Sequence, residues 1–254
     1  MSHVNPFFQG ASSSVSSTKS PESSTPVYAK LPAAPRTASP VPHLTSLYHF
    51  DSADGHGDRS YPGNCGGNLI KDLLRFYRPA TVFDPMTGSG TCRDVCKELA
   101  IPCVSADLKS GFDATNPDAY AKIASERGFA FIWAHPPYWR QKIYSDNSQD
   151  MSQAQSLDAF VHSYRIFIRE SAKLLTTGGK FAILMGDYID REERYVALTY
   201  YTKQLAFEAG LRMAAPDIVR FSHGASSNRK TYSSSFIPQL HDVCMVFEAK
   251  LPDC

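Results

Sequence analysis

The sequence contains no apolar run that approaches the roughly 20 residues of a membrane-spanning helix. Its N-terminus also lacks the basic stretch followed by an apolar stretch that is typical of a secretory signal. The formal net charge is only +1 over 254 residues, so any nucleic-acid surface must be local rather than global. From these absences we expect a soluble, cytoplasmic protein without a membrane partner.

The six cysteines include no C-x-x-C pair, the spacing found in many zinc and redox motifs. Cys92 and Cys96 lie one helical turn apart, but the sequence shows no matching His or Cys cluster beside them. The segment before residue 60 holds several polar side chains without an established ligand pattern: His49, Asp51, Asp54, His56 and Asp58. We therefore predict reduced thiols and no metal site.

Residues 1–45 contain ten serines and seven prolines and almost no apolar periodicity. Such a segment cannot bury enough surface to offset the entropy cost of ordering it. We predict a disordered leader, with a partner-binding arm through Phe7, Phe8 and Tyr28 as the alternative. The whole chain is 43% hydrophobic and 20% charged, and residues 46–254 can form one sizeable α/β domain.

The segment VFDPMTGSGT, residues 82–91, is a short apolar run that ends at Asp-Pro and opens into a glycine turn. Gly88 and Gly90 have no Cβ, so the backbone can take positive φ and a ligand can approach closely. Thr91 can cap the following helix, which completes a nucleotide-type site. Arg93 replaces the third glycine of the dinucleotide fingerprint, and no Gly-Lys-Ser/Thr follows, so both nucleotide motifs are excluded.

A second strand is predicted over residues 102–107, and it closes on Asp107, 17 positions after Gly90. In nucleotide-binding α/β folds, a carboxylate at this spacing accepts hydrogen bonds from both ribose hydroxyls. The alternative is a loop aspartate that caps the next turn.

Residues 129–134 form a continuous apolar run, as expected for a central parallel strand that is buried on both faces. The sequence His135-Pro136-Pro137-Tyr138 follows at its carboxyl end, where such sheets bind ligands. The two prolines stiffen the turn and leave preceding carbonyls free to accept a hydrogen bond, for example from an exocyclic amino group. Tyr138 and Trp139 offer flat faces on which a base could stack.

Strands and helices alternate from residue 81 onward, which predicts a doubly wound, parallel sheet. Helices are expected near residues 68–77, 92–99, 156–175 and 195–210, and later strands at 180–185, 212–221 and 242–248.

Two segments resemble a known family. Residues 84–91, DPMTGSGT, are similar to the D-P-F-x-G-S-G-T cofactor motif of S-adenosylmethionine-dependent DNA amino-methyltransferases. Residues 134–139, AHPPYW, resemble the catalytic motif of that family, which is Asp, Asn or Ser followed by Pro-Pro-Tyr or Pro-Pro-Phe. The resemblance extends over roughly residues 61 to 250.

The resemblance implies a Rossmann-like class I methyltransferase fold with a seven-stranded, mostly parallel sheet whose last strand is antiparallel. It also implies S-adenosylmethionine as the cofactor and an exocyclic amino group of a DNA base, N6 of adenine or N4 of cytosine, as the methyl acceptor. Two alternatives stay open. One is an RNA amino-methyltransferase, and the other is a catalytically silent methyltransferase fold that binds nucleic acid or a partner.

The motifs define a candidate site. The expected cofactor residues are Asn64, Asp84, Pro85, Thr87, Gly88, Ser89, Gly90, Thr91, Asp107 and Asp113. Asn64 lies where a helix of the resembled family holds the methionine end of the cofactor, and Asp113 is similar to the acid that accepts from the adenine amino group. For Asp113, helix capping is the alternative. The expected catalytic residues are His135, Pro136, Pro137, Tyr138 and Trp139.

His135 departs from the family motif, which places an Asp, Asn or Ser oxygen at this position. Neutral imidazole offers one nitrogen acceptor, and imidazolium offers none. Either His135 accepts through its nitrogen, or the Pro136 carbonyl makes the contact alone, or the chain has lost activity.

The segment 222–240 is polar and aromatic, and its Arg229, Lys230 and Tyr232 could pair with phosphate and stack on a splayed base. Simple solvation of these side chains is the alternative. The sequence shows no separate target-recognition domain, so we expect target choice to depend on loops such as 139–155 and 222–240 or on a partner.

Overall fold

The structure is a computed structural model that describes residues 32–33, 35–50, 54–123, 128–221, 235 and 237–249. The described residues from 35 onward belong to one compact unit. Of the expected disordered leader, residues 1–45, residues 1–31 and 34 lie outside the described residues. Within the described ranges, none of the helices combines the length and the apolar character that a bilayer crossing requires.

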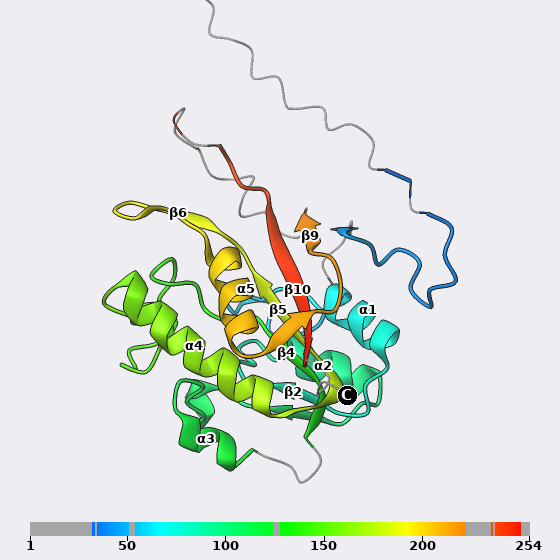
Figure 1. The fold of residues 1–254 in the computed structure, drawn as a ribbon, viewed down its shortest axis with the longest axis horizontal. Coiled ribbons are helices and arrows are strands. Elements are labelled where there is room, and N and C mark those ends of the chain that lie inside the picture. Colours follow the sequence, from blue (N-terminus) through cyan, green and yellow to red (C-terminus); the bar gives the residue numbers. More distant parts are fainter. Residues whose placement is uncertain are drawn as a thin grey trace, which may run out of the picture. The chain divides into compact units, whose positions relative to one another are not determined.

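One mixed sheet organises the domain (Figure 1). Its strands follow the order β1-β9-β10-β5-β4-β2-β3, and β8 also pairs with β10. Strand β10 is antiparallel to its neighbours β5, β8 and β9, whereas the β1–β9, β5–β4, β4–β2 and β2–β3 pairs are parallel. The bounds are β1 Leu47–His49, β2 Val82–Asp84, β3 Cys103–Ser105, β4 Phe129–Ala134, β5 Leu175–Met185, β8 Leu211–Met213, β9 Ile218–Phe221 and β10 His241–Ala249.

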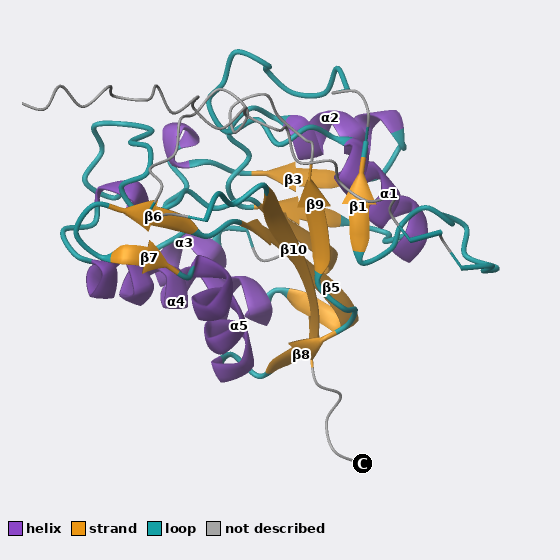
Figure 2. Ribbon diagram, turned by 90° about the horizontal axis from the view of Figure 1, so that it is seen from above, coloured by secondary structure: helices purple, strands orange, loops and turns teal. Residues whose placement is uncertain are grey.

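Helices cover both faces of this sheet. The helices are α1 Asn68–Tyr77, α2 Thr91–Glu98, α3 Pro117–Ala121, α4 Leu157–Lys173 and α5 Leu198–Glu208. Figure 2 shows α1 and α2 on one side of the sheet and α3, α4 and α5 on the other. The seven-strand path with an antiparallel last strand confirms the expected Rossmann-like, doubly wound fold.

Strand β4 shows why the continuous apolar run forms a central strand. Phe131 and Trp133 pack into the core beneath α1 and α2, whereas Ile132 and Ala134 pack into the core beneath α4. All four side chains are almost inaccessible to solvent. A strand with apolar residues on both faces of the sheet is stable only between two layers of helices, as predicted.

Helices α1 and α4 also follow their sequence signals. Helix α1 buries Leu69, Ile70, Leu73 and Leu74 on one face. It ends where Arg78 takes a left-handed conformation with φ 49° before Pro79. Ser156 is the N-cap residue of helix α4, and its hydroxyl accepts the backbone N–H of Ala159 at 3.1 Å.

Some element boundaries differ from the prediction. The closing strand expected over 212–221 is divided into β8 and β9 around Pro216, which has no N–H for the ladder. The start of the helix expected at 195 belongs instead to a hairpin of β6 Tyr188–Asp190 and β7 Arg194–Val196. Strand β1 was not predicted, because three residues are too few to show alternation.

The start of the domain also differs from the expected boundary at residue 46. Val41 is 2% exposed, and Leu44 packs against the core that contains α1. The His43 Nε2 atom lies 2.7 Å from Oδ2 of Asp72, a buried α1 carboxylate that also accepts from the Tyr48 hydroxyl at 2.7 Å. Val41, His43 and Leu44 therefore join the domain, because α1 offers an apolar surface and a buried acceptor beside them.

This contact predicts a sharp difference between two truncations. Deletion of residues 1–40 should leave the melting temperature nearly unchanged. Deletion of residues 1–45 also removes Val41 and His43, and burial of one valine contributes roughly 2 kcal/mol, so the melting temperature should fall by several degrees. Thermal unfolding followed by circular dichroism compares the two variants. Equal midpoints would show that residues 41–45 add nothing to the stability of the domain.

Candidate active site

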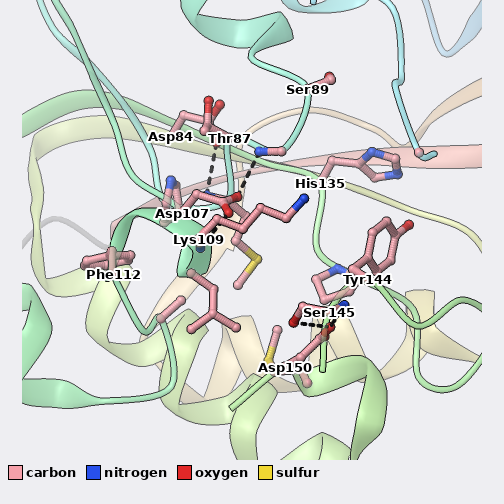
Figure 3. Close-up of a pocket in the computed structure, with 18 of the residues that line it drawn as sticks. Asp84, Thr87, Ser89, Asp107, Lys109, Phe112, His135, Tyr144, Ser145 and Asp150 are labelled. Atoms are coloured by element: carbon pink, nitrogen blue, oxygen red, sulfur yellow. Dashed lines mark hydrogen bonds between the residues drawn. The ribbon is translucent and has the colours of Figure 1, made fainter. Parts of the chain in front are cut away.

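A single open pocket gathers both sequence motifs at the carboxyl ends of β2, β3 and β4 (Figure 3). Its empty volume is about 910 Å³, a value that includes open solvent at its mouth. The walls come from segments 84–91, 107–115 and 133–137 and from two covering loops at 61–65 and 144–151. Parallel sheets bind ligands at this edge because the loops that follow neighbouring strands meet there.

The glycine turn after β2 has the expected backbone. Gly88 and Gly90 have φ values of 46° and 82°, a region that only glycine enters without strain. Gly90, and not Thr91, is the N-cap residue of α2. The Thr91 hydroxyl lies 2.7 Å from the Ser89 hydroxyl, so the prediction that Thr91 caps the helix is wrong.

Asp84 ends β2 and is 2% exposed. Burial raises the pKa of its carboxyl group to about 8, although the backbone N–H of Met86 donates to Oδ1 at 3.2 Å and favours the charged form. Below that pH the carboxyl group is mostly protonated, so the floor of the pocket carries little negative charge from this residue.

Asp107 connects the turn after β3 to the glycine turn. Its Oδ2 accepts the backbone N–H of Gly88 at 2.9 Å, and its Oδ1 accepts the backbone N–H of Lys109 at 3.0 Å. It therefore caps the short turn Leu108–Ser110, which was the alternative interpretation, and it also lines the pocket. Each carboxylate oxygen has two lone pairs, so each can still accept from a ligand hydroxyl.

Asp113 lines the same pocket beside Phe112. Its Oδ1 accepts the Thr115 backbone N–H at 2.8 Å and the Thr115 hydroxyl at 2.7 Å. Asn116, and not Asp113, is the N-cap residue of α3, so the helix-capping alternative is wrong for Asp113. Its bonds to Thr115 close a local turn and hold the carboxylate in one orientation in the pocket wall.

His135 and Pro137 bring the second motif into the pocket wall. The His135 ring stands edge-on to the Tyr138 ring, with centroids 6.0 Å apart and an interplanar angle of 84°. Tyr138 lies behind this wall, and burial raises the pKa of its phenol above the usual range. The chain therefore brings the cofactor-type loop and His135 to one pocket, as the order of the motifs predicted.

Trp139 does not take the role expected for it. It is 1% exposed in the core, its Nε1 donates to the Ala154 carbonyl at 2.8 Å, and Arg140 lies 4.1 Å from its ring centroid. A ring enclosed in this way has no face on which a base could stack. The expected stacking role is therefore wrong for Trp139 in this structure, and Tyr138 is the motif aromatic that stays near the pocket.

Three other expected residues support the site from outside its wall. Among the described residues, Asn64, Gly90 and Pro136 do not line the pocket. The Asn64 amide donates to the carbonyls of His56 and Asp58 at 3.2 and 3.0 Å, so it shapes the loop that carries Tyr61. The prediction of a direct cofactor contact for Asn64 is not met, because its side chain is engaged with the backbone.

The second covering loop contributes Tyr144 and Asp150, which sequence reasoning missed, and the first contributes Tyr61, three residues before the expected Asn64. Tyr61 and Tyr144 stack with centroids 6.1 Å apart, and the Lys109 ammonium group lies 4.8 Å from the Tyr61 ring centroid. Asp150, which is 6% exposed, shapes the second loop by accepting the backbone N–H groups of Ser145 and Ser152, each at 2.9 Å. Segment 145–152 contains Asn and Asp residues that favour tight turns, and this was the sequence feature that could have indicated an ordered loop here.

A buried ion pair fixes the first covering loop. The Arg220 guanidinium on β9 binds Asp242 on β10 in two places, Nε to Oδ1 at 2.9 Å and Nη2 to Oδ2 at 2.5 Å. Its remaining nitrogen donates to the backbone carbonyl of Cys65, a pocket residue. Both residues are buried, with Arg220 5% and Asp242 6% exposed. The expected nucleic-acid contacts Arg229, Lys230 and Tyr232 lie outside the described residues.

The raised pKa of Asp84 predicts a pH-dependent stability. The native pKa of about 8 exceeds the usual aspartate value, so the folded state binds the proton more tightly than the unfolded state does. This stabilisation is complete below the unfolded pKa of about 3.9 and is lost as pH rises through the native value. Relative to wild type, Asp84→Asn should become progressively more stable between about pH 5 and 8, by up to about 1.4 kcal/mol per pH unit. Urea unfolding at several pH values measures this difference, and parallel curves would contradict it.

Some solved structures are similar to this chain in fold, although their sequences are less than 20% identical to it. No protein-family model matches the chain, and no curated protein matches it. Similar solved structures include a candidate DNA modification methylase from Thermus thermophilus, at 17% identity and a TM-score of 0.39 over 56% of this chain and 54% of that chain. TrmN from Thermus thermophilus is similar at 19% identity and a TM-score of 0.42, over 73% of this chain and 49% of that one.

A methyltransferase from Archaeoglobus fulgidus that depends on S-adenosylmethionine is similar at 13% identity and a TM-score of 0.44, over 72% of this chain and 94% of that chain. The chain spans about half the length of the two Thermus proteins. At these identities and TM-scores, the similarities carry no argument about substrate. By its own strand order and helix layers, the chain has the Rossmann-like fold of class I methyltransferases.

Proposed function

We propose that this protein binds S-adenosylmethionine and transfers its methyl group to an exocyclic amino group of a DNA base, N6 of adenine or N4 of cytosine. One observation carries the proposal. The two segments that resemble the family motifs, 84–91 and 134–139, end the neighbouring parallel strands β2 and β4 and contribute to one pocket.

The residues of the pocket fit this cofactor. Asp107 keeps acceptor capacity on both carboxylate oxygens for the two hydroxyls of a ribose, and Asp113 offers a fixed carboxylate for an adenine amino group. The glycine turn lets its backbone approach the ligand closely, and Lys109 is a cation at the same wall. The bound cofactor would supply an activated methyl group on a sulfonium, so the protein needs to align the two reactants rather than activate the donor.

His135 is the group in the pocket wall that can act on the acceptor amine. The amine lone pair is delocalised into the base, and a hydrogen bond from the amine to an acceptor draws that lone pair toward the nitrogen. A neutral His135 ring nitrogen can accept this hydrogen bond, and it can hold the proton that the amine loses after transfer. Tyr138, behind the wall and edge-on to His135, would help to hold the imidazole ring in place beside the base.

Cofactor binding provides the first test. Wild-type protein should bind S-adenosylmethionine in isothermal titration calorimetry. Asp107→Asn keeps the shape of the side chain but replaces one acceptor oxygen with a donor, and it should weaken binding by about 1 to 3 kcal/mol, which is roughly 5- to 150-fold. Asp118→Asn, an exposed change in α3, is the matched control and should bind as wild type does. No detectable binding to folded wild-type protein would remove the methyltransferase proposal.

The role of His135 predicts a pH dependence. Transfer should fall as pH drops through the histidine value of about 6.5, because imidazolium has no acceptor and repels the positive charge that develops on the amine. His135→Asn restores an acceptor oxygen, so this variant should keep measurable activity. Its rate should no longer fall as the pH drops. His135→Ala should be slower than either. Rates with tritiated cofactor on DNA and on RNA, from about pH 5.5 to 8.5, measure these effects.

The same assay separates the alternatives. Transfer to RNA but not to DNA would replace the DNA substrate with RNA and leave the chemistry unchanged. If wild type transfers no methyl group to either polymer while His135→Asp does, the natural chain is a methyltransferase fold without catalytic activity.

A further inference from the structure

Three cysteines from two elements meet beneath the glycine turn. Cys92 and Cys96 lie one turn apart on α2, and Cys103 is the first residue of the adjacent strand β3. Their sulfur atoms all lie within 4.8 Å of one another. The sequence prediction that Cys92 and Cys96 have no partner cluster is therefore wrong, because the third thiol comes from the strand that packs against α2.

The surroundings of this cluster are those of an enclosed site. Cys92 and Cys96 are 1% and 0% exposed, and Cys103 is half-buried. The Cys103 sulfur lies 3.6 Å from the Ser105 hydroxyl. Within the described part of the chain, these three cysteines are the one group of metal-type ligands at such mutual distances, and they offer sulfur donors alone.

The geometry and the donor type select one class of ligand. Three metal–sulfur bonds of about 2.3 Å in a plane place the sulfur atoms about 4 Å apart, which lies inside the 4.8 Å limit on the distances between the three sulfur atoms. Zinc in structural sites takes four ligands, whereas thiolate donors favour soft ions such as Cu(I). We propose that Cys92, Cys96 and Cys103 form a three-thiolate site for a single soft metal ion of the Cu(I) type.

Binding at this site involves no redox change. Three sulfur–metal bonds form, the thiol protons pass to the buffer, and the ion keeps its oxidation state. Because Cys92 also lines the pocket and α2 starts directly after the glycine turn, the ion would cross-link α2 to β3 below that turn. Metal binding to the folded state should therefore raise the melting temperature.

The test is a titration of the reduced, full-length chain with Cu(I) under anaerobic conditions, in competition with bathocuproine disulfonate. Wild type should bind one ion per chain, and X-ray absorption should report sulfur ligands alone. Cys103→Ser and Cys96→Ser should each lower the affinity by at least about 100-fold. Cys65→Ser removes a half-buried thiol outside the cluster, and it should bind Cu(I) as wild type does.

Each metal-free variant is first compared with wild type by circular dichroism and thermal unfolding, so that a loss of fold is not read as a loss of a ligand. Because Cys103 is half-buried at the start of an edge strand, its serine variant should fold. Equal affinity of wild type and Cys103→Ser would overturn the proposal. A disulfide within the cluster after mild oxidation, with no tight Cu(I) binding to the reduced protein, would also overturn it and identify a redox pair instead.

Discussion

The buried ion pair between Arg220 and Asp242 is the constraint on which the site depends. It joins β9 to the antiparallel strand β10, and through Cys65 it fixes the loop that supplies Tyr61 to the pocket. Charges buried to this extent are tolerated only when each has its partner, and removal of one partner of such a pair typically costs about 3 to 5 kcal/mol. The position of this pocket wall is thus set by a paired charge inside the sheet rather than by apolar packing alone.

The remaining walls follow from the directions of the strands. Because β2, β3 and β4 are parallel neighbours, the turns after them meet at one edge without any long-range signal in the sequence. Asp107 then connects two of these turns by accepting the Gly88 backbone N–H. The cofactor-type loop and His135 are consequently held by the sheet itself, and the Tyr61–Tyr144 stack connects the two covering loops across them.

Much of this arrangement could be predicted from local signals. The buried run 129–134, the glycine turn and Asp107 each carry a pattern that depends on neighbouring residues, and the structure brings all three to the pocket. What could not be predicted depends on contacts between distant segments. Trp139 sits in a motif position but faces the core, where the Ala154 carbonyl accepts from it. Cys103 joins two helical cysteines only because β3 packs against α2.

Strand β1 has a consequence for the order in which the chain folds. Among the strands that the structure describes, it is the first to leave the ribosome, yet its partner is β9, with Leu47 opposite Val219 and His49 opposite Phe221. Pairing over such a separation closes a very long loop and cannot begin until β9 has been synthesised. The strands β2 to β5 and their helices can assemble during that interval, since their partners are already available. Strand β1 is therefore among the last of the described strands to join the sheet, although it is synthesised before the others.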